Sequence, residues 1–192
     1  MVDLSLTHPL GDIEKINGKY QSDSINIDIL DIPAFITLFA KKGKEAELKN
    51  VLGFNTSAGI AQQLQDFTAI PLSPEQWALR SHNQLGAQFG ETIAKKIKGI
   101  GYVSEQSAGR VLFRIKGEKA RDLMSRGCRL DLHPSAISDN YCSQTIIAQI
   151  GVLLHVSDSS PVYDLYVFSG FARSFWHWLD QSAAQFCVSN TQ

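Results

Sequence analysis

Several features that mark particular classes of protein are missing from this sequence of 192 residues. Cysteine occurs only three times, an odd number without close pairing, which argues against a secreted disulfide framework. The formal net charge of -1 argues against a nucleic-acid binder, which normally carries a strongly basic face. No apolar run reaches the ~18 residues that a membrane helix needs, and the N-terminal segment lacks the basic start and apolar centre of a signal peptide. We therefore expect a soluble, cytoplasmic protein with reduced thiols that binds neither nucleic acid nor membrane.

The common catalytic and nucleotide-binding motifs are also missing. Neither the phosphate-binding pattern GxxxxGK[ST] nor the hydrolase pattern GxSxG occurs. The pair Gly99-x-Gly101 resembles the start of a dinucleotide fingerprint, but it follows a predicted helix and precedes strands. The fingerprint needs the opposite order and a third glycine. These patterns therefore predict no nucleotide site.

What the sequence has is enough apolar material for one well-buried core. Hydrophobic residues make up 44% of the chain, and a soluble chain of this length buries roughly 70% of its unfolded surface. Residues 1–24 are polar, with scattered Gly, Asp and Ser, and predict a loose N-terminal arm. Residues 25–192 predict a single domain.

Within that domain the same order of elements occurs twice. In the first half, about residues 25–99, we expect a strand at 34–40, a helix ending at Gly53, strands at 66–72 and 75–80, and a helix from Ser81 to Gly99. In the second half, about 100–192, we expect a strand at 110–117, a helix at 118–126, strands at 145–156 and 163–169, and a helix at 170–186. The main difference between the halves is an insertion at 128–144.

Two strand–helix–strand–strand–helix units of this kind usually share one antiparallel-rich sheet with helices on one face. The sequence therefore predicts an α+β fold with split-βαβ, ferredoxin-like halves.

The stretch GCRLDLHP (127–134) places a thiol, a carboxylate and an imidazole within six residues, namely Cys128, Asp131 and His133. A catalytic thiol needs a lowered pKa, whereas Cys128 follows a predicted helix C-terminus, where the helix dipole opposes thiolate formation. We interpret the stretch as a chain reversal. Gly127 is expected to supply a left-handed cap, Cys128 to be buried, and Asp131 or His133 to bond to the loop backbone.

A metal site is not predicted either. The spacing Cys128-x4-His133, with Cys142 nine residues later, matches no standard zinc pattern. His155 and His177 stand alone in the sequence. We expect no catalytic, cofactor-binding or metal-ligating residues in this chain.

Two features predict contact with a partner. Ten basic residues but only three acidic ones fall between Lys95 and Arg129, a block typical of a solvated face or of a surface that docks an acidic partner. The terminal helix carries Phe171, Phe175, Trp178 and Phe186 at helical spacing, which predicts a core-sealing stripe. Trp176 lies off that stripe and is a candidate interface anchor.

Four stretches resemble the gamma subunit of heterotetrameric sarcosine oxidase. They are IPLSPEQWALR (70–80), GRVLFRIKGEKARDLMSRGCRLDLHP (109–134), SQTIIAQIGVLLH (143–155) and YDLYVFSGFARSFWHWLDQSA (163–183), in the family's order. Ser73 stands where the family pattern has a glycine.

The resemblance implies a non-catalytic accessory subunit whose fold is similar to part of the folate-binding aminomethyltransferase domain. It implies a complex with alpha, beta and delta subunits that oxidatively demethylates sarcosine to glycine, giving hydrogen peroxide and formaldehyde or methylene-tetrahydrofolate. FAD, FMN, NAD, tetrahydrofolate and zinc would belong to those partner subunits, and no family residue roles carry over to this chain.

Two alternatives remain open from the residues. One is a free-standing folate-binding or aminomethyl-transfer protein of the same fold, which would need an acidic residue facing the pterin. Among the acids inside the four stretches, the candidates for that role are Glu75 and Asp131. The other is a thiol enzyme built on Cys128 and His133.

Overall fold

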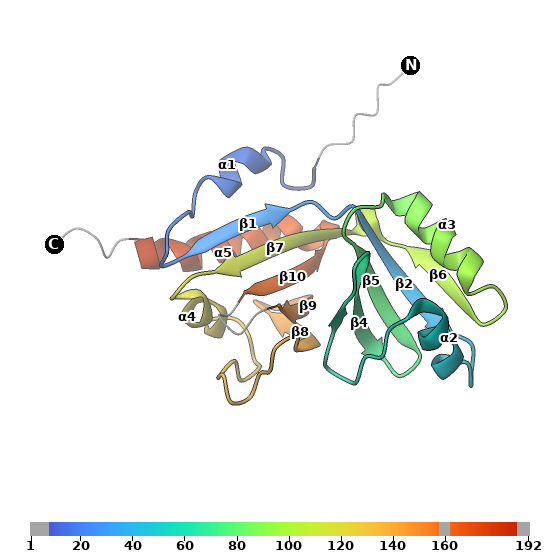
Figure 1. The fold of residues 1–192 in the computed structure, drawn as a ribbon. Coiled ribbons are helices and arrows are strands. Elements are labelled where there is room, and N and C mark those ends of the chain that lie inside the picture. The colour runs from blue at the N-terminus through green and yellow to red at the C-terminus, as the bar shows by residue number, and fades with distance from the viewer. Residues whose placement is uncertain (1–7, 158–161, 188–192) are drawn as a thin grey trace, which may run out of the picture.

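The computed structural model describes residues 8–157 and 162–187, which form two antiparallel sheets with helices on their outer faces (Figure 1). The strands are β1 (Asn26–Leu30), β2 (Ala34–Ala40), β3 (Gln62–Gln63), β4 (Phe67–Ser73), β5 (Gln76–Ser81), β6 (Gly101–Glu105), β7 (Arg110–Lys116), β8 (Cys142–Ile147), β9 (Ile150–Val156) and β10 (Tyr163–Phe168). The α-helices are α1 (Ile13–Asn17), α2 (Glu45–Leu52), α3 (Gly86–Lys96), α4 (Ala120–Ser125) and α5 (Ala172–Cys187), with 3-10 turns η1 (Ser107–Gly109) and η2 (Ser169–Phe171).

The predicted α+β fold rich in antiparallel strands is confirmed, but the strands do not share one sheet. Sheet A has the order β1-β7-β10-β9-β8, and sheet B has the order β3-β4-β5-β2-β6. If sheet B is matched to sheet A, β2 corresponds to β7, β5 to β10, β4 to β9 and β3 to β8. The edge position beside β2 is filled by β6, whereas the edge beside β7 is filled by β1 from the start of the chain. Each sheet therefore takes its last strand from across the predicted boundary near residue 100.

Three apolar clusters hold these layers together. The outer face of sheet A packs on α4 and α5 around Phe113, Leu123 and Phe175. The outer face of sheet B packs on α2 and α3 around Leu48 and Phe89. The two inner faces pack against each other through residues from both sheets, namely Phe35, Ala61, Ile70, Ala78, Leu112, Cys142, Leu153 and Tyr166. The rings of Phe35 and Tyr166, one from each sheet, lie 5.2 Å apart.

Several boundaries differ from the predictions for local reasons. The strand predicted at 145–156 is the hairpin β8–β9, whose two turn residues Ala148 and Gln149 both have positive φ, as in a type I′ turn. Neither residue is Gly or Asn, so the sequence carries no turn signal there. The helix predicted from Ser81 starts later, at Gly86, and the Ser81 hydroxyl instead accepts a hydrogen bond from the Gln84 amide at 2.9 Å. Ser81 thus ends β5 and stabilises the turn after it.

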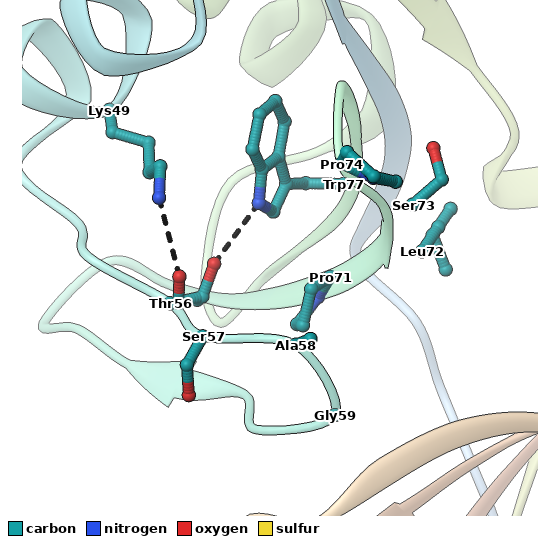
Figure 2. Close-up of a pocket in the computed structure, with 10 residues that line it drawn as sticks. All are labelled: Lys49, Thr56, Ser57, Ala58, Gly59, Pro71, Leu72, Ser73, Pro74 and Trp77. Carbon is teal, nitrogen blue, oxygen red and sulfur yellow. Dashed lines mark hydrogen bonds between the residues drawn. The ribbon is translucent and has the colours of Figure 1, made fainter.

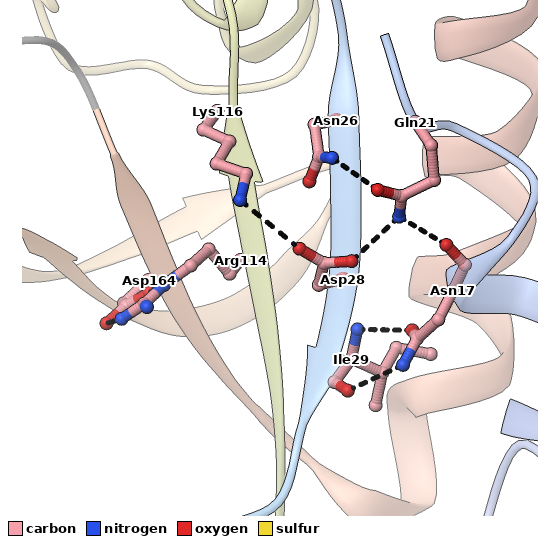
Figure 3. Close-up of polar contacts among 8 residues, drawn as sticks. All are labelled: Asn17, Gln21, Asn26, Asp28, Ile29, Arg114, Lys116 and Asp164. Atoms are coloured by element: carbon pink, nitrogen blue, oxygen red, sulfur yellow. Dashed lines mark hydrogen bonds and ion pairs between the residues drawn. The ribbon is translucent and has the colours of Figure 1, made fainter. Parts of the chain in front are cut away.

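The segment predicted as a loose arm includes ordered structure. Residues 1–7 of it lie outside the described residues, but residues 8–24 contain α1 and pack against β1. The Asn17 side chain pairs with both backbone groups of Ile29, donating to its carbonyl at 3.0 Å and accepting from its amide at 2.6 Å (Figure 3). This pairing blocks the outer edge of β1, which would otherwise be free to pair with another chain.

Candidate functional site

The polar side chains of GCRLDLHP are bonded within their own loop, and its thiol packs against the core of sheet A. Asp131 accepts a hydrogen bond from the His133 amide at 2.9 Å, and His133 Nδ1 lies 2.7 Å from the Ser135 hydroxyl. Both side chains are exposed and bonded within their own loop, so the predicted bond to loop backbone is confirmed. Cys128 is half-buried against the core of sheet A, and its burial raises the pKa of the thiol. A raised pKa disfavours the thiolate that a nucleophile requires.

Gly127 is needed for space and not for a left-handed backbone. The prediction of a positive φ is wrong, because Gly127 is absent from the positive-φ glycines of the described residues. A Cβ at this position would lie 2.5 Å from the indole of Trp178 and 3.2 Å from the Ala148 amide nitrogen. That amide donates to the Gly127 carbonyl at 3.2 Å. Gly127 therefore lets the chain pass between α5 and the β8–β9 turn.

A polar row that the sequence analysis did not assemble crosses the inner face of sheet A. Register pairs place one side chain from each strand in line: Cys142 on β8, His155 on β9, Asp164 on β10, Arg114 on β7 and Asp28 on β1. We call these five residues the polar row. Cys142, His155 and Asp164 are buried. Two residues that the sequence left isolated, Cys142 and His155, are thus direct cross-strand neighbours.

Asp164 is the electrostatic centre of this row (Figure 3). Its two carboxylate oxygens each accept a 2.7 Å hydrogen bond from Arg114, one from Nε and one from Nη2. Arg80 of sheet B adds a 3.4 Å contact to Asp164 and a 3.3 Å bond to the Tyr166 hydroxyl. Hydrogen bonding to Asp164 raises the pKa of Arg114. A buried carboxylate with two guanidinium partners joins the two sheets and leaves its lone pairs occupied.

Burial disfavours the charged forms of the cysteine and the histidine in the polar row. Burial raises the pKa of Cys142 to about 12, so the thiol stays protonated at neutral pH. Burial also lowers the pKa of His155. This effect is larger than the opposite effect of the nearby Asp164 carboxylate, which raises that pKa. Within the described residues no three His, Cys, Asp or Glu side chains gather to hold a metal ion. The row therefore acts in packing and in the join between sheets.

A pocket of about 300 Å³ lies beside the segment 71–77 (Figure 2). Its walls include Pro71, Pro74 and the ring of Trp77, whose Nε1 donates to the Thr56 hydroxyl at 3.0 Å. Lys49 lines the same pocket and lies 3.4 Å from the Thr56 carbonyl. The pocket is at the small end of ligand sites, and none of its lining residues carries a carboxylate. It does not supply the acid that a pterin site needs, and Glu75 is exposed outside its lining.

A wider hollow of about 740 Å³ lies between the 21–26 segment and the start of α4. Its acids, Asp23 and Glu118, are exposed and share the hollow with Lys116 and Arg121. The backbone carbonyl of Asp23 accepts a 3.0 Å hydrogen bond from the Glu118 amide. The hollow is thus a seam where the N-terminal segment meets α4, and its two exposed acids share it with two basic side chains.

The two predicted docking features are arranged differently from the expectation. The basic block does not make one face, because Lys95 and Lys96 lie on α3 while Arg121 lies on α4, at opposite sides of the molecule (Figure 1). Trp176 is half-buried, with its ring 6.2 Å from that of Tyr20. His177 is exposed and 3.1 Å from Gln181 on the same helix. The aromatic side chains that are exposed beside α5 are Phe168 and Phe171.

Comparisons with known proteins agree with this geometry. The family model for the sarcosine oxidase gamma subunit matches residues 67–185, more than half of the chain. A chain of heterotetrameric sarcosine oxidase from Corynebacterium sp. U-96, solved with pyrrole 2-carboxylate, has the same fold, with a TM-score of 0.84 and 18% identity over 97% of this chain and 99% of that one. The glycine cleavage system aminomethyltransferase T from Bartonella henselae matches at a TM-score of 0.60 and 17% identity, over 91% of this chain and 50% of that one.

Two further findings are negative. No curated protein sequence gives a match to this chain. None of the helices in the described part of the chain has both the length and the apolar character that a membrane crossing requires.

Proposed function

The chain belongs to the sarcosine oxidase gamma subunit family, and we propose that it supports the other subunits of that complex without carrying out chemistry itself. As a member of this family it is an accessory subunit of a heterotetrameric sarcosine oxidase. The observation that carries the proposal is the family match over residues 67–185, reinforced by a shared fold along the whole chain.

The state of the chemically capable groups supports a structural role. The thiols of Cys128 and Cys142 have raised pKa values because they are buried. Asp164 is committed to Arg114 and Arg80. Asp131 and His133 are bonded within an exposed loop. Each of these groups takes part in local packing or hydrogen bonding, which favours a structural role for this chain in the complex.

The family assignment is also the basis on which we propose the finer features of the complex. The complex would contain alpha, beta and delta subunits beside this one and would oxidise sarcosine to glycine in the cytoplasm. FAD, FMN, NAD, tetrahydrofolate and zinc would reside in the partner subunits. The aminomethyltransferase-like fold would then serve as a scaffold in this chain, since the chain spans half of the aminomethyltransferase that it resembles.

The experiment that tests the proposal is co-expression of this chain with the other three subunits, purified through a tag on one of them. We expect this chain to co-purify in stoichiometric amount and the isolated chain to show no sarcosine-dependent oxygen consumption. Turnover by the isolated chain would contradict the proposal.

Calorimetric titration of the isolated chain with tetrahydrofolate separates the main alternative. We expect no binding at micromolar concentration. Tight binding with a single site would favour a free-standing folate protein.

A further inference from the structure

The inner face of sheet A extends beyond the part that sheet B covers. Next to the polar row lies an apolar set of Leu112, Tyr166 and Leu153, all buried against sheet B. Two residues further along the strands, Arg110 pairs with Phe168, and Ile146 pairs with Gly151. We call these last four residues the open end. Ile146 is 44% exposed and Phe168 is 45% exposed, so sheet B does not cover this set.

The open end is hollowed. A groove of about 280 Å³ is lined by the four residues of the open end together with Leu72 and Phe35 of sheet B. Gly151 contributes to the hollow because it has no side chain, and a Cβ built there would meet nothing within 4 Å. Phe171, 56% exposed, follows Phe168 closely in the chain. Clustered exposed apolar side chains of this kind are typical of interaction sites.

Arg110 gives the groove its charge. Its guanidinium carbon lies 3.5 Å from the ring centroid of Phe168 and 5.6 Å from that of Phe35. Its Nε is buried and has no hydrogen-bond partner, and no carboxylate in the described residues forms an ion pair with it. Arg114, four residues along the same strand and on the same face, has a carboxylate on two of its nitrogens. Arg110 thus lies against two rings and has no carboxylate partner among the described residues.

From this arrangement we propose that the open end is the docking site for a segment of another sarcosine oxidase subunit that presents a carboxylate beside a large apolar side chain. The carboxylate pairs with the Arg110 guanidinium, whose planar fork matches its geometry. The apolar side chain fills the space over Gly151, between Ile146 and Phe168. This inference rests on the proposed function, and it names a contact surface that the family assignment does not.

Charge argues against a second copy of this chain as the occupant. A twofold dimer presents the same patch on both subunits, so it would bring two Arg110 guanidiniums toward each other. An acidic segment removes that repulsion and supplies the carboxylate that the Arg110 guanidinium lacks among the described residues. Arginine and aromatic residues are also the side chains that most often dominate binding energy at interfaces.

The test compares variants in the reconstituted four-subunit complex, with assembly measured as the amount of this chain that co-purifies with a tagged partner subunit. Arg110→Glu reverses the charge, Arg110→Gln removes it, and Phe168→Ala removes the ring. We expect each to weaken assembly by about tenfold or more, with Arg110→Glu the most severe. Melting temperatures of the isolated chains should stay within about 3 °C of wild type, because Arg110 makes no ion pair among the described residues and Phe168 is 45% exposed.

Two matched controls lie far from the groove. Lys96→Glu reverses an exposed charge on α3, and Tyr102→Ala removes a ring on β6 that is 62% exposed. Both should assemble as wild type does. Wild-type assembly together with unchanged assembly of the Arg110 and Phe168 variants would overturn the docking site and leave the proposed function standing. Failure of the wild-type chain itself to co-purify would overturn both.

Light scattering of the isolated chain gives the remaining outcome. If the chain dimerises and Arg110→Glu changes that dimerisation but not the assembly of the complex, a second copy is the occupant and the proposal is wrong.

Discussion

The two ends of the inner face of sheet A differ in how their charges are satisfied. At the polar row, Arg114 and Arg80 converge on Asp164, which is 1% exposed. At the open end, Arg110 lies against the rings of Phe168 and Phe35 without a carboxylate partner in the described residues. Arg110 and Arg114 both lie on β7, four residues apart and on the same face of the sheet. The difference indicates that one end holds the two sheets together while the other is available to a partner.

The largest expected effect comes from emptying the centre of the polar row. Asp164→Ala leaves two guanidiniums without their counter-ion at the join between the sheets, and breaking a buried pair in this way costs about 3–5 kcal/mol. Urea denaturation followed by circular dichroism would measure the loss. Asp122→Ala is the matched control, because Asp122 pairs with Lys119 on an exposed surface, where such pairs contribute about 0–1 kcal/mol. Equal losses in the two variants would contradict a stabilising buried ion pair at the join between the sheets.

A second substitution tests whether the close packing of Gly127 positions the β8–β9 hairpin, which contributes Ile146 and Gly151 to the open end. Gly127→Ala places a methyl group against Trp178 and the β8–β9 turn, which leads into Ile150 and Gly151. Overpacking of this kind costs about 1–3 kcal/mol, and the hairpin shift should also weaken assembly. Gly170→Ala is the control for stability, since a Cβ there meets nothing within 4 Å and the free energy of unfolding should stay close to that of wild type. A neutral Gly127→Ala would contradict the close approach.

Alkaline pH should weaken the folded chain through buried groups on this inner face. The pKa of Cys142 is raised from 9.0 to about 12, so the protonated thiol stabilises the fold fully below pH 9. That contribution is lost as pH rises from 9 toward 12, because the unfolded thiol ionises first. The loss is about 1.4 kcal/mol per pH unit. Denaturation of wild type and Cys142→Ala at pH 8 and pH 10 measures it, and a wild-type curve no steeper than the variant's would contradict the prediction.

The smallest effect is expected at the cysteine that opens the motif GCRLDLHP. Cys128→Ser should leave sarcosine oxidation by the assembled complex nearly unchanged, because the raised pKa of the Cys128 thiol disfavours the thiolate that a nucleophile requires. Oxygen consumption at saturating sarcosine is the measurement. Loss of activity with assembly intact would revive the thiol-enzyme alternative.

The fold class followed from periodicity, whereas the pairing of strands across the chain did not. The strand at 110–117 could be predicted because Val111, Phe113 and Ile115 alternate with basic neighbours, apart from Leu112. The strands β1 and β6 were missed because each is short and is stabilised by pairing with a strand from the other half of the chain. The hairpin turn at Ala148 and Gln149 lacked the usual Gly or Asn, so tertiary contacts hold a conformation that local propensity does not announce.

The candidate site shows the same limit. Arg110 and Arg114 were visible in the sequence as members of a basic block, but only the register of β7 and β10 reveals that one faces Asp164 and the other faces Phe168. The polar residue Asp164 inside an apolar strand was a signal for a buried ion pair, since an unpaired carboxylate there would be costly. Trp176 drew attention as an isolated aromatic, yet its ring packs on Tyr20 and the exposed rings lie at Phe168 and Phe171.

Hydrogen–deuterium exchange of the chain, alone and within the assembled complex, tests the central claim most directly. The account predicts new protection on assembly in the β8–β9 hairpin around Ile146 to Val152 and at Phe168 to Phe171. Amides around His155 and Asp164, already buried between the sheets, should exchange slowly in both states. New protection confined to α3 or α4, with the hairpin unchanged, would contradict the account.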